Sequence, residues 1–413
     1  MVSEAAINER ILKYRTAQVT LTVTDEGGRP LADAEVAVGM VRHKFLFGCN
    51  IFRLRPGSTA EDDGAYGERF AELLNYATLP FYWQGYEQSE GSTGKERVMA
   101  MAHWCQEHGI RTKGHPLVWT LEPRWLAEKP PAEAESLLWK RIDREVTAFR
   151  GLTDIWDVLN EAVVGPDQAR GRNAQTILRL YERDGRVAVI SKAFAVARKA
   201  NPDATLILND FRTDEAYEKI IGEALAQGVP IDVIGIQSHM HGGYWGGEKA
   251  WEVCERFARF GKPLHFTEVT ILSGEAVGDI DWENSRGTRW TTSPEFEERQ
   301  ARQAAEFYRV LFSHPAVEAI TWWDFSDSGA WMRAPAGFLR EDMSPKPVYE
   351  ALKKLIRGDW WTGPLTLRTD GKGTATFSGF LGEYALDAAG ARGTLQLGRA
   401  GKQVLTVQLL PTR

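Results

Sequence analysis

The stretch IWDVLNEA, residues 155–162, is an apolar run that ends on an amide and a carboxylate. A short run rich in Ile, Val, Trp and Leu is typical of a buried β-strand. Asn160 and Glu161 could cap the next helix, or they could stand at the strand end to do chemistry. The pattern of the surrounding chain bears on both the fold and this choice.

Seven further runs of the same kind are spread along the chain, at residues 45–51, 76–81, 111–119, 205–210, 232–239, 263–269 and 319–325. Between them lie amphipathic stretches such as ESLLWKRIDREVTAFR, in which apolar residues recur at helical spacing. Strands that alternate with helices indicate parallel βα units, and eight such units predict an α/β fold of the (β/α)8 TIM-barrel type. A doubly wound sheet is the alternative, but no G-x-G-x-x-G follows the first run.

The two ends of the chain have a different pattern. Residues 19–41 alternate with period two around Asp-Glu-Gly-Gly, and residues 358–413 hold short strands separated by glycine turns. We therefore predict three parts: an N-terminal β-hairpin segment (1–42), a catalytic barrel (43–357) and a β-rich accessory domain (358–413). The hairpin is expected to join the tail in one small β-sandwich. Trp360 and Trp361 are expected to pack this tail onto the barrel instead of binding sugar.

Composition excludes several classes of partner. The chain of 413 residues has a net charge of −6 and no run of basic residues, so a nucleic-acid partner is not expected. The sequence has no stretch of 18 apolar residues, so a membrane span is not expected. Cys49, Cys105 and Cys254 are far apart and read as buried thiols. Residues 1–18 show no signal peptide, so the compartment stays open between secreted and cytoplasmic, and nothing indicates the oligomeric state.

In a TIM barrel, catalytic groups stand at the carboxyl ends of the strands. The predicted strands end on polar or aromatic residues, namely His115, Asn160, Glu161, Asn209, Asp210, Gln237, His239, Glu268 and Trp323. Any one of them could be a helix cap, but together they favour one polar site. Glu161 and Glu268 are the two candidates for acid–base and nucleophilic work on a glycosidic bond. Carboxyl groups about 5–5.5 Å apart would mark a retaining enzyme.

The ordered motifs WDVLNEA, LND, IQSH, FTEV and TWWDFSDSGAW resemble glycoside hydrolase family 10, which is dominated by retaining endo-β-1,4-xylanases. The resemblance runs from about Phe45 to Ile356 and implies Glu161 as acid/base and Glu268 as nucleophile. It implies that Asn160 bonds the sugar 2-hydroxyl and that His239 orients Glu268. The residues it implies for substrate binding are His115, Trp119, Gln237, Trp323, Trp331, Trp83 and Tyr82. It implies a polysaccharide or oligosaccharide substrate and no cofactor or metal, although His239 and His241 alone could suggest one.

The chain departs from the family pattern on the side that grips the sugar. Thr120 stands where a second histidine is usual, and Leu79 and Tyr82 stand where the family has an asparagine and a lysine. These changes remove hydrogen-bond donors to sugar hydroxyls. The resemblance thus implies a retaining glycoside hydrolase that cleaves β-1,4-xylosidic bonds in xylan or xylo-oligosaccharides. The alternatives are a β-glycosidase that acts on a different or decorated glycan and a carbohydrate-binding relative without catalytic activity. The loops after 232–239 and 263–269 either reshape the cleft or are solvated. An esterase is disfavoured because no G-x-S-x-G is present.

Overall fold

The computed structural model describes residues 2–282 and 286–411 and contains a closed eight-stranded parallel barrel. Around the barrel the strand order is β12-β3-β4-β5-β6-β7-β8-β9. The strands are β3 (Leu46–Asn50), β4 (Tyr76–Pro80), β5 (Arg111–His115), β6 (Ile155–Asn160), β7 (Thr205–Asp210), β8 (Val233–Ile236), β9 (Leu264–Val269) and β12 (Val317–Trp322). Each coincides with one of the apolar runs of the sequence, so the TIM-barrel prediction is confirmed.

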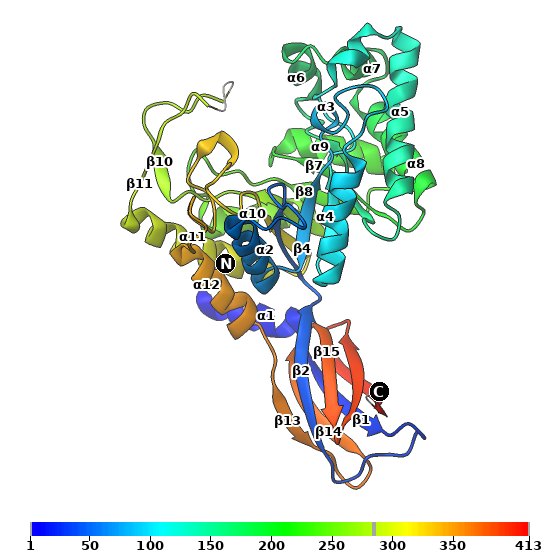
Figure 1. Cartoon of the computed structure of the whole chain (residues 1–413), viewed down its shortest axis with the longest axis vertical. Helices are drawn as coiled ribbons and strands as arrows, with labels where there is room; N and C mark the ends of the chain where they lie inside the picture. The colour runs from blue at the N-terminus through cyan, green and yellow to red at the C-terminus, as the bar shows by residue number, and fades with distance from the viewer. Residues whose placement is uncertain (1, 283–285, 412–413) are drawn as a thin grey trace.

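Helices follow the strands and cover the outside of the barrel (Figure 1). They are α2 (Glu61–Leu73), α3 (Trp83–Tyr86), α4 (Lys95–Glu107), α5 (Pro131–Ala148), α6 (Gly165–Gly171), α7 (Gln175–Asp184), α8 (Arg186–Ala200), α9 (Glu215–Ala226), α10 (Gly246–Ala258), α11 (Pro294–Ser313) and α12 (Pro347–Lys353). Short 3-10 turns at Arg124–Glu128 and Trp331–Arg333 and a π-helical turn at Lys354–Asp359 complete the helical segments. Among the described residues, no helix has both the length and the apolar character needed to cross a bilayer.

The two β-rich ends of the chain build an accessory β-sandwich below the barrel (Figure 1). One sheet has the order β14-β1-β17 and the other β13-β2-β15-β16-β18. The strands are β1 (Thr16–Thr24), β2 (Glu35–His43), β13 (Leu365–Arg368), β14 (Thr374–Phe380), β15 (Gly382–Ala388), β16 (Ala391–Leu397), β17 (Gly401–Gln408) and β18 (Leu410–Pro411). Buried residues of both sheets, such as Leu21 and Tyr384, meet in a common core.

The prediction of an N-terminal hairpin is wrong, because β1 and β2 belong to different sheets. β1 pairs with β14 and β17, whereas β2 pairs with β13 and β15. Each N-terminal strand alternates buried and exposed residues, and this pattern is satisfied equally by a partner from the far end of the chain. The C-terminal tail supplies those partners. The strands that pair in the sandwich are therefore separated in sequence by the entire barrel.

Helix α1 (Glu4–Arg15), which the sequence pattern did not reveal, joins the sandwich to the barrel. Its Ile7 and Ile11 are buried in the same core as the barrel residues. Arg15, at its end, donates hydrogen bonds to the carbonyls of Phe312, at 2.6 Å, and His314, at 2.6 Å. The domain boundaries after residues 42 and 357 stay a proposal. The segment before residue 43 contributes to both the barrel and the sandwich.

The tryptophan pair at the start of the tail packs the sandwich against the barrel, as predicted. Trp360 is only 3% exposed and stacks on Phe312 with ring centroids 4.2 Å apart. Trp361 lies edge-on to His43 at 5.3 Å. Trp360 therefore offers no open face to a sugar. The three cysteines are free and buried, which confirms the prediction that they are buried thiols.

Candidate active site

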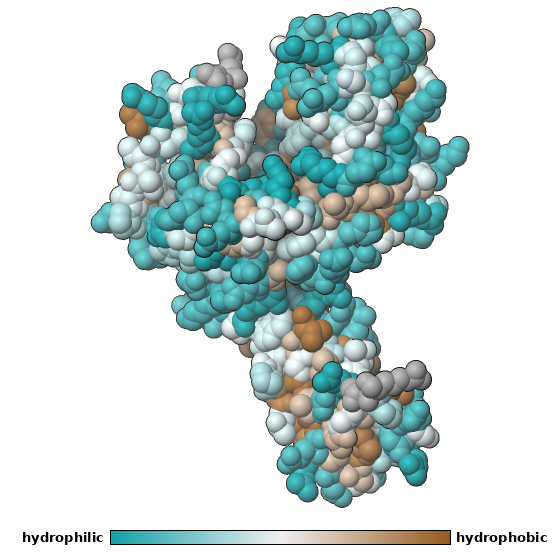
Figure 2. All heavy atoms as spheres, in the orientation of Figure 1, coloured by the Kyte–Doolittle hydropathy of each residue, from teal (hydrophilic) through white to brown (hydrophobic). Residues whose placement is uncertain are grey.

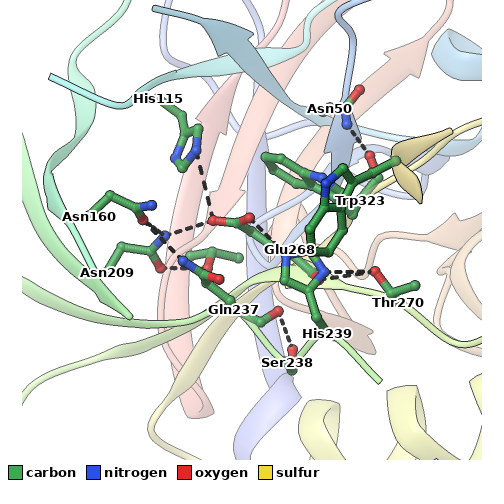
Figure 3. A network of polar contacts seen from close by, with 12 residues as sticks. Asn50, His115, Asn160, Asn209, Gln237, Ser238, His239, Glu268, Thr270 and Trp323 are labelled. Carbon is green, nitrogen blue, oxygen red and sulfur yellow. Dashed lines mark hydrogen bonds and ion pairs between the residues drawn. The ribbon is translucent and has the colours of Figure 1, made fainter. Parts of the chain in front are cut away.

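The carboxyl ends of the barrel strands bring the predicted polar residues together at one mouth (Figure 3). Figure 3 shows His115, Asn160, Asn209, Gln237, His239, Glu268 and Trp323 around a common centre. In the space-filling view the surface above the barrel is hollowed between the lobe of the β10–β11 hairpin and the lobe of α6 and α7 (Figure 2). The strands of this hairpin are β10 (Gly274–Ala276) and β11 (Trp290–Thr292).

Glu268, at the end of β9, is held by a donor at each carboxylate oxygen. Asn209 Nδ2 donates to Glu268 Oε1 at 2.8 Å, and His239 Nε2 lies 3.1 Å from Oε2. His239 is oriented in turn by Thr270, whose Oγ1 is 2.9 Å from Nδ1. Burial raises the pKa of Glu268, but the charge of His115 and the hydrogen bond from His239 outweigh it, so this pKa lies below its usual value. Glu268 is therefore ionised at neutral pH, as a nucleophile must be.

Glu161, directly after β6, has a left-handed backbone with φ of 59°. A non-glycine residue in that region is strained, and such strain is common at functional sites. Its backbone N–H donates to the Asn209 carbonyl at 2.8 Å, which fixes the turn. Its side-chain oxygen Oε1 accepts from Asn160 at 3.2 Å and from Gln237 at 3.1 Å. Asn160 and Glu161 therefore face the barrel mouth and do not cap the next helix, whose N-cap is Val164.

A chain of amide groups links the two carboxylates. Asn209 Nδ2, which bonds Glu268, also donates to Asn160 Oδ1 at 2.8 Å. Asn160 Nδ2 then donates to Glu161, and Thr267 Oγ1 donates to Asn209 Oδ1 at 2.6 Å. Because each amide is fixed at both of its polar atoms, the positions of the two carboxylates are set relative to one another. Such preorganisation is what a two-carboxylate mechanism needs.

The sequence analysis did not assign a role to Asn209, although it stands at a strand end in the LND motif. It also missed two residues on the far side of Glu161. Gln168, on α6, donates to Glu161 Oε2 at 2.6 Å, beside Trp119, which donates to the same oxygen at 3.1 Å. Arg172 lies over the Trp119 ring at 4.4 Å. The position of Asn209 at a strand end was a usable signal, whereas neither Gln168 nor Arg172, which directly follows α6, belongs to any motif.

His115 is connected to a buried ion pair under the site. Its Nδ1 is 2.7 Å from Asp157 Oδ2, and Lys113 Nζ is 2.7 Å from the same oxygen. Burial alone would raise the pKa of Asp157, but Lys113 and His115 lower it by more, so this pKa lies below its usual value. On its other side, His115 Nε2 is 3.1 Å from the Tyr82 hydroxyl and 3.9 Å from Glu268. Tyr82 thus reaches the site from β4 through this histidine.

The predicted aromatic walls are in place around these polar groups. Trp323 lies edge-on to His115, with ring centroids 5.4 Å apart, and to His239, at 5.8 Å. Trp331 is 38% exposed and packs on His239 at 4.7 Å and on His241 at 4.8 Å. Of the two, Trp331 offers the more open face to a ligand.

Trp83 packs in the barrel wall, and its role in substrate binding stays a prediction. Its side chain is 6% exposed, donates to Glu87 at 2.9 Å and lies edge-on to Trp125. It opens helix α3, which turns the indole into the barrel wall under the guanidinium of Arg141. Leu79, which stands where the family has a sugar-binding polar residue, is fully buried in the barrel core. In the described part of the chain, no group of three or more His, Cys, Asp or Glu side chains is arranged as metal ligands.

Comparison with known proteins agrees with this geometry. Residues 79–355 match the family model described as "Glycosyl hydrolase family 10". Endo-1,4-beta-xylanase B of Thermotoga neapolitana is 30% identical over 263 residues, which cover 59% of this chain and 68% of that protein. Anti-sigma-I factor RsgI6 of Acetivibrio thermocellus is 25% identical over 388 residues, or 92% of this chain, but the match spans only 46% of that protein.

Solved structures show the same fold. Xylanase 10B from Thermotoga petrophila RKU-1, in complex with xylobiose, superposes with a TM-score of 0.62 at 24% identity, covering 76% of this chain and 95% of that one. Native xylanase 10B from Thermotoga maritima covers 87% of this chain and 99% of its own, with a TM-score of 0.59 at 23% identity. The family model covers the barrel, including all the strand ends from β4 onward that carry the site. The chain therefore belongs to glycosyl hydrolase family 10.

Proposed function

We propose that the protein is a retaining glycoside hydrolase that cleaves β-1,4-xylosidic bonds in xylan or xylo-oligosaccharides. The observation that carries the proposal is the amide chain that fixes Glu161 and Glu268, with Glu268 kept ionised. The names of the xylanase relatives support xylan as the substrate class. Asn160, His239, His115, Trp119, Gln237, Trp323, Trp331 and Tyr82 are proposed to contact or orient the substrate and the two carboxylates.

The proposed reaction is a double displacement. Glu268 Oε attacks the anomeric carbon while Glu161 gives its proton to the leaving glycosidic oxygen, so the C–O bond to the leaving sugar breaks as the glycosyl–enzyme ester forms. Glu161, now ionised, takes a proton from water, and the resulting hydroxide attacks the same carbon and releases Glu268. Amide donors beside both carboxylates hold them in position through both steps.

The test is product release from xylan and from xylo-oligosaccharides, measured for the wild type, Glu268→Ala and Glu161→Ala. Both variants should lose nearly all activity on substrates with poor leaving groups, and azide should restore turnover of activated glycosides by Glu161→Ala. NMR of the first product should show the β-anomer. An α-anomer, or unchanged activity in Glu268→Ala, would contradict the mechanism.

A second candidate function is glycan binding without turnover. It is favoured by the match over 92% of the chain to a protein named as an anti-sigma factor, which is a regulatory name. Under this alternative, xylo-oligosaccharides would bind to the wild type and to Glu268→Ala with equal affinity, and neither would release product. Hydrolysis by the wild type alone would exclude it.

A further inference from the structure

The carboxylate of Glu161 accepts hydrogen bonds at both of its oxygens. Asn160 Nδ2 and Gln237 Nε2 donate to Oε1, at 3.2 and 3.1 Å. Trp119 Nε1 and Gln168 Nε2 donate to Oε2, at 3.1 and 2.6 Å. The bond from Gln168 is the shortest of these four, and Gln168 comes from helix α6 and not from a barrel strand. Helix α6 therefore takes part in the site through this amide.

Gln168 is itself held by a chain of donors that begins at a cation. Arg172 Nη1 donates to Thr120 Oγ1 at 2.7 Å. Because the hydroxyl oxygen is the acceptor of that bond, the hydroxyl hydrogen donates to Gln168 Oε1, which is 3.4 Å away. This contact turns the NH2 group of Gln168 toward Glu161. The three bonds thus run in one direction, from a guanidinium to a carboxylate, and hydrogen bonds in such a chain polarise one another.

Packing around this chain keeps it in place. Thr120 is only 2% exposed, and the Arg172 guanidinium lies over the Trp119 ring at 4.4 Å. One cation therefore supports both donors to Glu161 Oε2, because it contacts Trp119 directly and Gln168 through Thr120. Burial lowers the pKa of Arg172, and the charge of Glu161 opposes this shift. A guanidinium keeps its charge at neutral pH in such a setting.

The direction of these bonds decides which step of the reaction they assist. A donor stabilises an ionised carboxylate more than a protonated carboxyl group. In the first step of the proposed reaction Glu161 gives up its proton, so negative charge develops on it in the transition state. A donor at Oε2 is then bonded more strongly in the transition state than in the ground state, which is the condition for acceleration. In the second step Glu161 starts ionised and gains a proton, so the same donor gives no acceleration.

We propose that Gln168 is a positioning residue for the acid step, which donates to the carboxylate that forms on Glu161, and that Thr120 and Arg172 fix its orientation. The inference rests on the proposed function. It gives a role to Thr120, which departs from the family pattern, and to two residues that belong to no motif.

The test uses two variants of the full chain and one control. Gln168→Leu removes the donor and nearly keeps the size of the side chain, and Thr120→Val removes the hydroxyl and keeps the branched shape. Arg170→Met is the matched control, because Arg170 is on the same helix but forms exposed ion pairs with Asp167, at 3.3 Å, and Glu182, at 3.2 Å. Thermal unfolding checks that each variant folds. If Gln168→Leu does not fold, Thr120→Val tests the inference by itself.

The substrates are two aryl β-xylobiosides that differ only in the leaving group. Phenolate needs the proton from Glu161 to leave, whereas 2,4-dinitrophenolate leaves without it. In Gln168→Leu, kcat/KM for the phenyl substrate should fall about 10-fold, the loss expected for one hydrogen bond to a charged group. For the 2,4-dinitrophenyl substrate, kcat/KM should stay at the wild-type value, and kcat, which the second step limits, should not fall. The control should match the wild type on both substrates.

Combining the variants tests the order of the chain. Thr120→Val should lower kcat/KM for the phenyl substrate by a smaller factor than Gln168→Leu. It should cause no further loss in the Gln168→Leu background, because Thr120 acts on Glu161 through Gln168. Losses that multiply in the double variant would overturn the inference.

The outcomes separate this inference from the proposed function. A loss confined to the phenyl substrate supports both. If the wild type hydrolyses both substrates but Gln168→Leu loses activity equally on the two, or loses none, the inference fails and the proposed function stands. If the wild type hydrolyses neither substrate, the proposed function fails and the inference fails with it.

Discussion

Individual residues at the carboxyl ends of the barrel strands form the candidate site, because the closed parallel barrel brings all of these ends to one mouth. Glu161, Glu268, Asn160 and Gln237 all stand at the carboxyl ends of strands, where parallel βα geometry brings them together. Trp83 packs apart from these groups, because it follows β4 by a short loop and begins helix α3. A residue that lies beyond a strand end is placed by the loop, which sequence patterns do not specify.

Asn209 is the positioning residue whose removal should be most informative. Asn209→Ala removes the donor to Glu268 Oε1 and to Asn160 Oδ1. We expect kcat/KM to fall about 10- to 100-fold, the loss typical of a hydrogen bond to a charged group. Because this donor favours the ionised form of Glu268, its loss raises the pKa of Glu268 and moves the acidic limb of the pH–rate profile to higher pH.

Asn201→Ala is the matched control for this prediction. Asn201 is also buried and donates to a carboxylate, Asp154, at 2.7 Å, but it precedes β7 at the opposite end of the barrel. It should lower thermal stability and leave the acidic limb unchanged. If the acidic limb of the pH–rate profile does not shift in Asn209→Ala, and activity falls only in proportion to stability, then Asn209 has only a structural role.

At the scale of elements, the β10–β11 hairpin is the insertion most able to shape the cleft. Together with the loop after β8, the hairpin lines a cavity of about 630 Å³. The two loops whose role in the cleft the sequence left open therefore lie side by side. Trp282 is 59% exposed on this hairpin and lies edge-on to His241, with ring centroids 6.0 Å apart. An exposed indole beside a cavity is suited to stack on a sugar ring.

Trp282→Ala should reduce kcat/KM on xylan and long xylo-oligosaccharides by about 3- to 10-fold, the loss expected for one aromatic stacking contact. The same variant should lose less activity on 4-nitrophenyl β-xylobioside, since that substrate has fewer sugar rings that can stack on the indole. Trp139→Ala, on α5, serves as the control. Equal losses on short and long substrates would show that the hairpin supports the catalytic residues and does not extend the cleft.

At the scale of the whole molecule, buried carboxyl groups make the stability depend on pH. Burial raises the pKa of Asp210 to about 7, with the charge of Glu161 adding to the effect and the N–H groups of Val163 and Arg212 opposing it. Since the folded pKa is above the unfolded value of about 3.9, the folded state holds its proton more tightly. This contribution is fully present below about pH 4 and is lost as the pH rises to about 7.

Asp210→Asn should therefore make the free energy of unfolding less dependent on pH between pH 5 and pH 8. Each unit of pKa difference corresponds to about 1.4 kcal/mol. The measurement is urea unfolding at several pH values for both proteins. The carboxylates with lowered pKa, such as Glu268, change stability only below their ordinary range and do not interfere in this window. Parallel pH profiles for the two proteins would contradict the prediction.

The sequence by itself determined the barrel, its eight strands and the two carboxylates, because strand periodicity and strand-end position are local properties that the TIM-barrel topology turns into a site. Only the tertiary structure decided what these groups contact. The pairing of β1 and β2 with strands at the opposite end of the chain and the donation by Gln168 to Glu161 both join residues that no local pattern relates. Such contacts depend on side-chain packing between distant segments, which hydrophobic periodicity does not encode.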